Sequence, residues 1–359
     1  MSEGGVLVAG AGPVGLATAL ELSCLGHPVR VVERDRDYHE ESRALGVNPR
    51  TLELLEHTGV SARLWEVGKR VDGVEIAFGG GAPTFLPFDV RHRWPLMLIV
   101  PQSRTERVLG EALAARGVPV EWERPVTRVR LEADGAPVVT LGPDGEEARP
   151  GWLVAADGAR STVRGALDVA WPEETTHRDW GILDARVEGT LPRDRVFADF
   201  GADGPLVSIP IEEDVVRLIA TRPDPAPLLP AGVRILEEIW RSTFDIRFAV
   251  AGTFLTGRVA LAGDAAHVHS PVGARGMNLG IEDAVLLARA LDADPPAVAR
   301  WAAERRGKAH TVLRQTRLAT RGVRVTSGPA RLLRRSVLRA AARVGPLRRA
   351  ALRRLGGLG

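Results

Sequence analysis

Hydrophobic residues at the start of the chain form two short runs, separated by a glycine-rich turn and a stretch with helical spacing. The first run, Val6–Ala9, leads directly into the turn GAGPVG at 10–15, and the second run, VRVVE, occupies 29–33. Between them, apolar residues over 16–25 follow a helical pattern that Gly26 closes. A strand, a helix and a second strand in this order predict the βαβ unit that opens a parallel sheet.

Further along, the hydrophobic pattern alternates between helical and β-rich segments. Pro49 is placed to begin a helix that Gly59 ends, and short strands broken by glycine and proline follow over 71–99. Helical spacing returns over 102–116. The remaining predicted elements are strands at 118–123, 126–131, 152–156 and 259–262, hairpin turns at 134–135 and 144–145, short strands with loops over 171–254, and a helix at 281–291.

These changes of pattern predict an α/β fold in which two kinds of domain are interleaved along the chain. A length of 359 residues also favours two domains. The predicted parts are a Rossmann-like domain built from 1–70, 101–165 and 256–300, a β-sheet domain inserted in two pieces, 71–100 and 166–255, and a C-terminal helical tail, 301–359.

Composition favours a globular cytoplasmic protein. The chain is 45% hydrophobic and 26% charged, which allows both a core and a solvated surface. Cys24 is the only cysteine and lies in an apolar helical segment, so we expect a buried thiol and no disulfide within the chain. The apolar run over 6–25 contains Glu21 and has no basic residue before it, so it predicts neither a signal peptide nor a membrane span.

Charge is distributed unevenly along the chain. Residues 300–359 contain 17 Lys and Arg against Glu304 alone, a net charge of +16, so the rest of a chain whose total is +3 carries −13. Such a tail suits nucleic acid or anionic lipid, but apolar residues at near-helical spacing over 331–355 favour a helix docked on the acidic body. We therefore expect no nucleic-acid or membrane partner, and a monomer or homodimer.

A dinucleotide is the ligand that the first glycine-rich turn predicts. Its glycines allow a tight turn and close approach of the backbone to a pyrophosphate, while the helix start supplies free N–H groups. Glu33 ends the next strand, where a carboxylate can accept hydrogen bonds from both ribose hydroxyls, and Arg34 follows it. The predicted contacts in the turn are Gly10, Gly12, Pro13, Val14 and Gly15.

A second strand-to-helix turn lies in the stretch LAGDAAHVHSPVGARGMNLGIEDA at 261–284. A Gly-Asp pair ends an apolar strand, and glycines precede a helix whose N–H groups stabilise a nearby anion. His267 and His269 form an H-x-H pair without a matching cysteine or acidic cluster. We therefore expect a packed His267, a place on a pocket wall for His269, and no metal.

Together with the run DGARSTVR at 157–164, these two turns resemble the class A FAD-dependent aromatic hydroxylases and monooxygenases, the p-hydroxybenzoate hydroxylase-like family. The resemblance follows element order over most of 1–300 and includes SRALGVNPRTLELLE and PQSRTERVL. It implies FAD as the cofactor and a catalytic role for Pro271 and Arg43. Besides Glu33, Arg34 and the first turn, the FAD contacts that it implies are Arg43, Gln102, Val126, Asp157, Gly158, Asp264, Gly273, Gly276, Met277 and Asn278.

In this family the Gly-Asp strand end meets the ribityl chain of FAD, and the following turn passes beside the isoalloxazine ring. The resemblance therefore assigns Asp264 to the ribityl chain. Where a G-G-Q-G run is frequent in the family, this chain has Ala274 and Arg275 in the middle positions. The added side chains are expected to alter flavin mobility or to recruit an acidic substrate.

The resemblance implies a monooxygenase that uses NADPH or NADH as a transient co-substrate and delivers oxygen from a flavin hydroperoxide to an aromatic or polyketide-like substrate. A dehydrogenase, reductase or halogenase on the same scaffold stays an alternative, as does, with less support, a binding protein that acts through its tail. No general base is identified from the sequence. Candidate pocket walls, each of which also suits ordinary core, are Trp94, Trp180, Phe197, Phe200 and Phe244.

Overall fold

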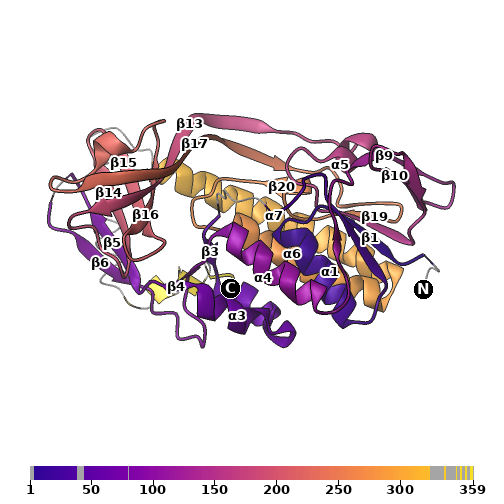
Figure 1. Cartoon of the computed structure of the whole chain (residues 1–359). Coiled ribbons are helices and arrows are strands. Elements are labelled where there is room, and N and C mark those ends of the chain that lie inside the picture. Colours follow the sequence, from indigo (N-terminus) through magenta and orange to yellow (C-terminus); the bar gives the residue numbers. More distant parts are fainter. Residues whose placement is uncertain are drawn as a thin grey trace.

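The structure, a computed structural model, describes residues 4–38, 44–79 and 81–323, together with 335–336, 345, 348–349, 352–353 and 356–358. A β-rich part lies at one end of the molecule and a part with most of the helices lies at the other (Figure 1). Two long strands, β13 (Glu174–Glu188) and β17 (Arg234–Val250), run between the two parts.

A six-stranded, mostly parallel sheet forms the centre of the helical part. Its order is β18-β19-β12-β1-β2-β8, and only the pair β18 with β19 is antiparallel. The parallel pairing of β1 with β2 confirms the predicted βαβ unit. The strands are β1 (Val6–Ala9), β2 (Val29–Val32), β8 (Val120–Glu121), β12 (Trp152–Ala155), β18 (Leu255–Thr256) and β19 (Val259–Leu261).

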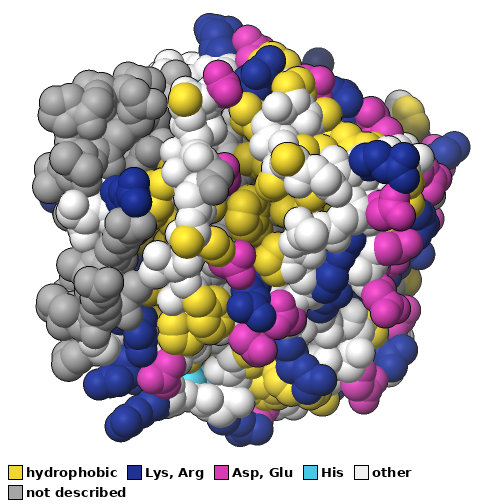
Figure 2. All heavy atoms as spheres, turned by 90° about the vertical axis from the view of Figure 1, so that its left-hand side faces the viewer, with side chains coloured by type: hydrophobic (Ala, Val, Ile, Leu, Met, Phe, Trp, Pro, Cys, Tyr) yellow, Lys and Arg dark blue, Asp and Glu magenta, His cyan; other side chains and the backbone are white. Residues whose placement is uncertain are grey.

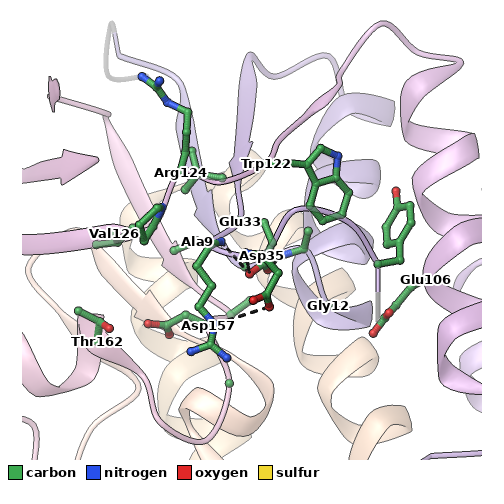
Figure 3. Close-up of a pocket in the computed structure, with 18 of the residues that line it drawn as sticks. Ala9, Gly12, Glu33, Asp35, Glu106, Trp122, Arg124, Val126, Asp157 and Thr162 are labelled. Atoms are coloured by element: carbon green, nitrogen blue, oxygen red, sulfur yellow. Dashed lines mark hydrogen bonds and ion pairs between the residues drawn. The ribbon is translucent and has the colours of Figure 1, made fainter. Parts of the chain in front are cut away.

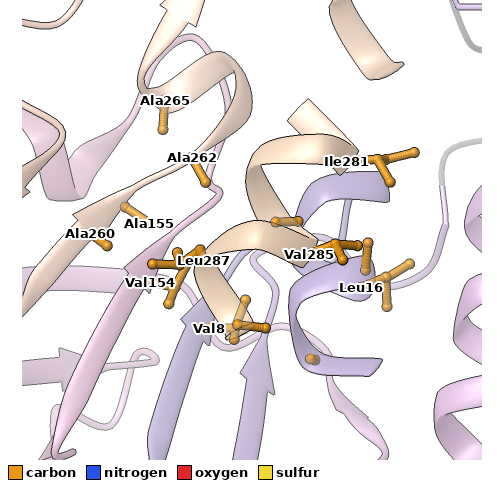
Figure 4. Packing of buried hydrophobic residues seen from close by; sticks show 14 of the residues in the cluster. Val8, Leu16, Val154, Ala155, Ala260, Ala262, Ala265, Ile281, Val285 and Leu287 are labelled. Carbon is orange, nitrogen blue, oxygen red and sulfur yellow. The ribbon is translucent and has the colours of Figure 1, made fainter. Parts of the chain in front are cut away.

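Two helices, α1 (Pro13–Cys24) and α6 (Gly276–Ala293), pack together against this sheet. Leu16 of α1 and Val285 of α6 meet the sheet near Val8 (Figure 4), and all three side chains are fully buried. Each such side chain stabilises the fold by roughly 1.5–3 kcal/mol. Cys24, expected to be buried, is only partly covered, and this partial burial raises the pKa of its thiol.

The β-rich part is built on an eight-stranded sheet with the order β20-β17-β13-β16-β15-β14-β5-β6. One face of this sheet carries a separate apolar core around Leu183, Leu206 and Leu218. Figure 2 shows the end of the molecule that this sheet occupies, where apolar side chains gather among charged ones. The other strands are β5 (Gly73–Ala77), β6 (Thr84–Pro87), β14 (Val196–Gly201), β15 (Gly204–Pro210), β16 (Val215–Ala220) and β20 (His267–Val268).

Strands β13 and β17 are longer than the short strands expected over 171–254. The two strands pair antiparallel from Glu174 opposite Phe248 to Glu188 opposite Arg234, with several register shifts along the way. β17 alternates half-buried and exposed residues over most of its length, so it has no apolar run to mark a long strand. The register shifts let both strands bend and twist without ending.

The segment after Asn48 also departs from a single helix. Helix α2 (Pro49–Leu54) begins at Pro49 as predicted, with the side chain of Asn48 accepting a hydrogen bond from Thr51 N. A short 3-10 turn and Gly59, at φ 80°, then redirect the chain into α3 (Val60–Val67). The remaining elements are α4 (Gln102–Ala114), α5 (Thr162–Ala166), and two small sheets: β3 (Gly46–Val47), β7 (Leu98–Ile99) and β4 (Lys69–Arg70); and β9 (Val126–Leu131), β10 (Pro137–Leu141) and β11 (Glu146–Ala148).

The last long helix, α7 (Pro295–Val323), begins before residue 301 and continues through it. Its arginines dock on the body: Arg317 pairs with Glu174 at 2.7 Å, and Arg306 Nε donates to the carbonyl of Ala251 at 3.1 Å. Most of the basic segment 331–355 lies outside the described residues. Among the helices that the structure describes, none has both the length and the apolar character needed to cross a membrane.

Candidate functional site

The predicted motif residues meet at one edge of the six-stranded sheet. Gly10, Glu33 and Asp157 follow the parallel strands β1, β2 and β12, and Asp264 follows β19 in a short 3-10 turn. Because parallel strands present their carboxyl ends at the same edge, these distant segments converge on one side of the sheet. A Cβ on Gly263 would lie 2.7 Å from the side chain of Val14, so the Gly-Asp turn packs directly on the start of α1.

The glycine-rich turn combines internal constraint with open space. A Cβ at Gly10, whose φ is 105°, would overlap the carbonyl of Ala156, and one at Gly15 would overlap the carbonyl of Gly10. A Cβ at Gly12, by contrast, would meet nothing within 4 Å. The protein itself therefore does not require glycine at position 12. A ligand that approaches the start of α1 closely would require glycine there, because any side chain would occupy its space.

Glu33 is held over this turn by the backbone. Its Oε2 accepts from Ala11 N at 2.6 Å, and its Oε1 accepts from Arg34 N at 2.8 Å (Figure 3). The carboxylate is thus fixed at the end of β2 with lone pairs left for further donors. Arg34 is exposed, and its guanidinium lies 3.6 Å from the carboxylate of Asp35.

A pocket of about 190 Å³ opens between these groups. Four residues predicted as cofactor contacts line it: Gln102 at the start of α4, Val126 at the start of β9, and Asp157 with Gly158. Gln102 Nε2 donates to Glu106 Oε1 at 2.9 Å. Sequence reasoning missed several lining residues because no local motif marks them. These are Asp35, Asp37, Tyr38, Glu106, Trp122, Arg124 and Thr162.

The two carboxylate oxygens of Asp157 differ in their hydrogen bonding. Its Oδ2 accepts from Val163 N at 3.2 Å, whereas its Oδ1 is buried without a hydrogen-bond partner among the described residues. Burial raises the pKa of this carboxyl, and hydrogen bonds from Ser161 and the backbone oppose the shift. Arg164 braces the turn by donating to the carbonyls of Ala159 and Ala265 at 2.9 and 3.0 Å.

The later turn, from Pro271 to Asn278, enters α6 in a strained conformation. Gly273 has φ 93° and Ala274 has φ 52°, a left-handed value uncommon for alanine. Pro271 is exposed, and Gly276 and Met277 are half-buried. Arg275, considered as a contact for acidic substrates, is only 7% exposed and points into the protein.

Both polar atoms of the Asn278 side chain form hydrogen bonds within the protein. Its Nδ2 donates to the carbonyls of Gly46 and Ala274, both at 2.8 Å, and its Oδ1 accepts from Asn48 N and Thr51 Oγ1 at 2.9 and 2.8 Å. Any contact of Asn278 with a cofactor therefore involves its backbone.

A second, smaller pocket of about 60 Å³ lies beside this turn. Gly273, Ala274 and Asn278 line it together with the apolar side chains of Phe88, Leu96 and Met97. None of the five aromatic residues considered as pocket walls lines it; Trp180 and Phe197, for example, lie in apolar cores. Arg43 lies outside the described residues.

His267 is packed as predicted, 2% exposed, with Nε2 2.6 Å from Asp283 Oδ2. His269 stands in stacked geometry with it and donates from Nδ1 to the carbonyl of Ser270 at 2.9 Å. Burial, with a smaller contribution from His267, lowers the pKa of His269 to about 4. His269 lines neither of the two pockets described above.

A sequence model described as an FAD binding domain matches residues 3–214 and 231–316 of this chain. The chain belongs to this family. A monooxygenase of Streptomyces rimosus, 12-dehydrotetracycline 5-monooxygenase/anhydrotetracycline 6-monooxygenase, is 36% identical over 345 residues, which is 87% of this flavoprotein and 68% of that enzyme.

Solved structures agree with this placement of the flavoprotein. An anhydrotetracycline hydroxylase from Streptomyces rimosus superposes with a TM-score of 0.78 at 30% identity, over 99% of this chain and 76% of that one. A Diels-Alderase of pyrroindomycin biosynthesis has a TM-score of 0.84 at 28% identity, over 99% of this chain and 80% of that one. The flavoprotein is an FAD-dependent monooxygenase with NAD(P)H as co-substrate.

The described residues fit FAD on physical grounds. Gly12 leaves open space at the start of α1, where free N–H groups suit a pyrophosphate. The Glu33 carboxylate beside it suits ribose hydroxyls, and the unpartnered Oδ1 of Asp157 supplies a further acceptor in the same pocket. No group of three or more metal-ligating side chains occurs among the residues that the structure describes.

Proposed function

We propose that this flavoprotein hydroxylates an aromatic or polyketide-like substrate whose reacting ring enters the second pocket. The observation that carries the proposal is the position of that pocket between the turn at Gly273 and Ala274 and the apolar side chains of Phe88, Leu96 and Met97. A flat apolar ring suits such a wall. The relative from Streptomyces rimosus, named for its action on tetracycline precursors, supports the same substrate class.

In this proposal the chain divides the tasks between its segments. The turn from Gly10 to Gly15 and Glu33 hold the adenosine and pyrophosphate of FAD, while Gln102, Val126, Asp157 and Gly158 line the same channel. Asp264 binds the ribityl chain. The N–H groups at the start of α6, beside Gly276, Met277 and Asn278, face the pyrimidine end of the flavin, where they stabilise negative charge.

FAD, reduced by NADPH or NADH, supplies the activation of O2. The protein would contribute orientation and exclusion of water: the apolar side chains of Leu96 and Met97 would fix the substrate ring, and Pro271 would lie beside the isoalloxazine ring. Arg43, which the family resemblance assigns to contact with the flavin, is the second proposed catalytic residue.

We further propose that residues 1–70, 101–165 and 256–300 act as the FAD-binding domain and that 71–100 and 166–255 act as the substrate domain. The membership of the six- and eight-stranded sheets supports this division. A single cysteine suits work in the cytoplasm, as a monomer or homodimer without nucleic-acid or membrane partners.

The decisive experiment records the visible spectrum of the purified protein and then follows NAD(P)H oxidation, O2 uptake and product mass with a panel of polycyclic phenols. We expect bound FAD, O2 uptake coupled to NAD(P)H oxidation, and a product one oxygen atom heavier than the phenol. A Met97→Ala variant is expected to raise KM for small phenols by about tenfold while leaving the Kd for FAD unchanged, because it widens only the second pocket.

Other outcomes point to other reactions. Substrate oxidation without oxygen incorporation indicates a dehydrogenase, and halide incorporation indicates a halogenase. Product formation that needs neither NAD(P)H nor O2 indicates a cycloaddition, the activity named for the structural neighbour from pyrroindomycin biosynthesis. A protein that takes up no FAD contradicts the whole proposal.

A further inference from the structure

A buried cluster of charged side chains lies behind the turn that enters α6. Asp283 on α6 is 1% exposed and accepts from Arg305 Nε at 2.6 Å, in addition to its contact with His267. Arg305, on α7 and 6% exposed, also reaches Glu282 at 3.2 Å through Nη1. The cluster thus joins strand β20, helix α6 and helix α7 at one point.

Both ends of the flavin-facing turn connect to this cluster. His267 lies just before the turn and binds Asp283 directly. Arg275 ends the turn as the N-cap of α6 with a buried side chain, and Glu282 and Asp283 follow about two turns later on the same helix. Ser270, immediately before the turn, is tied to α7, because Thr320 Oγ1 donates to Ser270 Oγ at 2.7 Å.

The Arg, Asp and Glu side chains around the turn carry equal numbers of positive and negative charges. Two guanidinium groups, Arg275 and Arg305, stand against two carboxylates, Glu282 and Asp283. Burial lowers the pKa of Arg275, with Glu282 opposing the shift, but an arginine stays charged in proteins. Removal of one member therefore leaves a net charge in a poorly solvated place, where its field is weakly screened.

We propose that Arg275 and Glu282 are positioning residues that set the reduction potential of the flavin through the charge of this cluster. The inference rests on the proposed function, which puts the pyrimidine end of FAD against the start of α6. Reduction adds negative charge there, so the positive side chain at the N-cap of α6 favours the reduced flavin and the nearby carboxylate disfavours it.

The test compares two substitutions of opposite sign in the FAD-loaded protein. Arg275→Gln is expected to lower, and Glu282→Gln to raise, the ratio of reduced to oxidised flavin at a fixed reference-dye potential by about tenfold, which is about 30 mV for a two-electron couple. Arg275→Lys keeps the charge and is expected to stay within about twofold of the unmodified protein.

Glu21→Gln is the matched control. Glu21 is 2% exposed and lies 2.9 Å from Arg289 of α6 and 2.8 Å from His57, so this substitution also removes a buried carboxylate that is paired with the same helix, away from the turn. This variant should unfold at lower temperature with an unchanged reduction potential.

The inference would be overturned if the reduction potential shifted in the same direction in both test variants, or in neither. A merely loosened turn would affect both variants alike, whatever the sign of the charge removed. If Arg275→Gln does not retain FAD, the reduction potential of Glu282→Gln compared with that of Glu21→Gln still tests the inference. A chain that binds no FAD at all contradicts the proposed function instead, so the two failures are distinguishable.

Discussion

The backbone N–H of Ala11 donates a hydrogen bond to Glu33 Oε2 over 2.6 Å, joining the glycine-rich turn to the end of the next strand. The carboxylate therefore lies beside the free N–H groups of α1. In the proposed function these groups bind the ribose and the pyrophosphate, and their fixed arrangement lowers the ordering cost of binding.

Replacement of Glu33 by Gln should weaken FAD binding. A neutral amide loses the charge-assisted hydrogen bonds to ribose hydroxyls, each worth about 1.5–3 kcal/mol, so we expect the Kd to rise at least about tenfold. Quenching of FAD fluorescence during titration measures it. Glu121→Gln, at the end of the neighbouring strand and bound to Arg30, is the control and should bind FAD normally.

Gly12→Ala and Gly15→Ala should fail in different ways. The methyl group at position 12 meets no protein atom, so the free energy of unfolding should change by less than about 1 kcal/mol while the Kd for FAD rises at least about tenfold. The methyl group at position 15 overlaps the carbonyl of Gly10 and should prevent stable folding. Thermal unfolding without FAD separates the two effects, and equal loss of stability in both variants would contradict this account.

Asn278→Ala should destabilise the fold more than a surface substitution does. It leaves Asn48 N and the carbonyl of Gly46 without their buried partner, at about 1–3 kcal/mol for each group, so we expect a loss of at least about 2 kcal/mol in the free energy of unfolding. Urea unfolding measures the loss. Asn278→Asp keeps the accepted hydrogen bonds but turns a buried carboxylate oxygen toward the carbonyls of Gly46 and Ala274, so it should destabilise the fold at least as much as Asn278→Ala.

His269 should make stability depend on pH below neutrality. Its pKa is about 4 in the folded chain and about 6.5 when unfolded, so between these values the unfolded chain binds the proton and stability falls as pH falls. From pH 7.5 to 5 the loss is about 2 kcal/mol relative to His269→Gln, whose amide can still donate to Ser270. Chemical unfolding at several pH values measures the free energy of unfolding of both proteins. If that free energy changes equally with pH in the two proteins, the assignment is refuted.

Local signals made the first half of the site predictable. The strand, glycine turn and acid over 6–33 predict a dinucleotide site because backbone geometry leaves few alternatives, and the structure brings Gly10, Gly12 and Glu33 to one pocket. The partners of Asn278 were not predictable, since Gly46 and Asn48 lie some 230 residues away and carry no marker of the pairing. Phe88, Leu96 and Met97 were not predictable either, because they lie in a proline-rich segment without a recognisable motif. The burial of Arg275 was also not predictable, since it depends on the packing of α7 against α6.

Strand pairing also imposes an order on assembly during synthesis. β1 pairs with β12, and β12 pairs with β19, so the central parallel sheet receives its last parallel strand only after residue 261 has left the ribosome. By then β13 and β17, which pair with each other, have already emerged. The inserted domain can therefore begin to fold while the nucleotide-binding half still waits for a strand, and that half exposes an unpaired edge of β12 in the meantime.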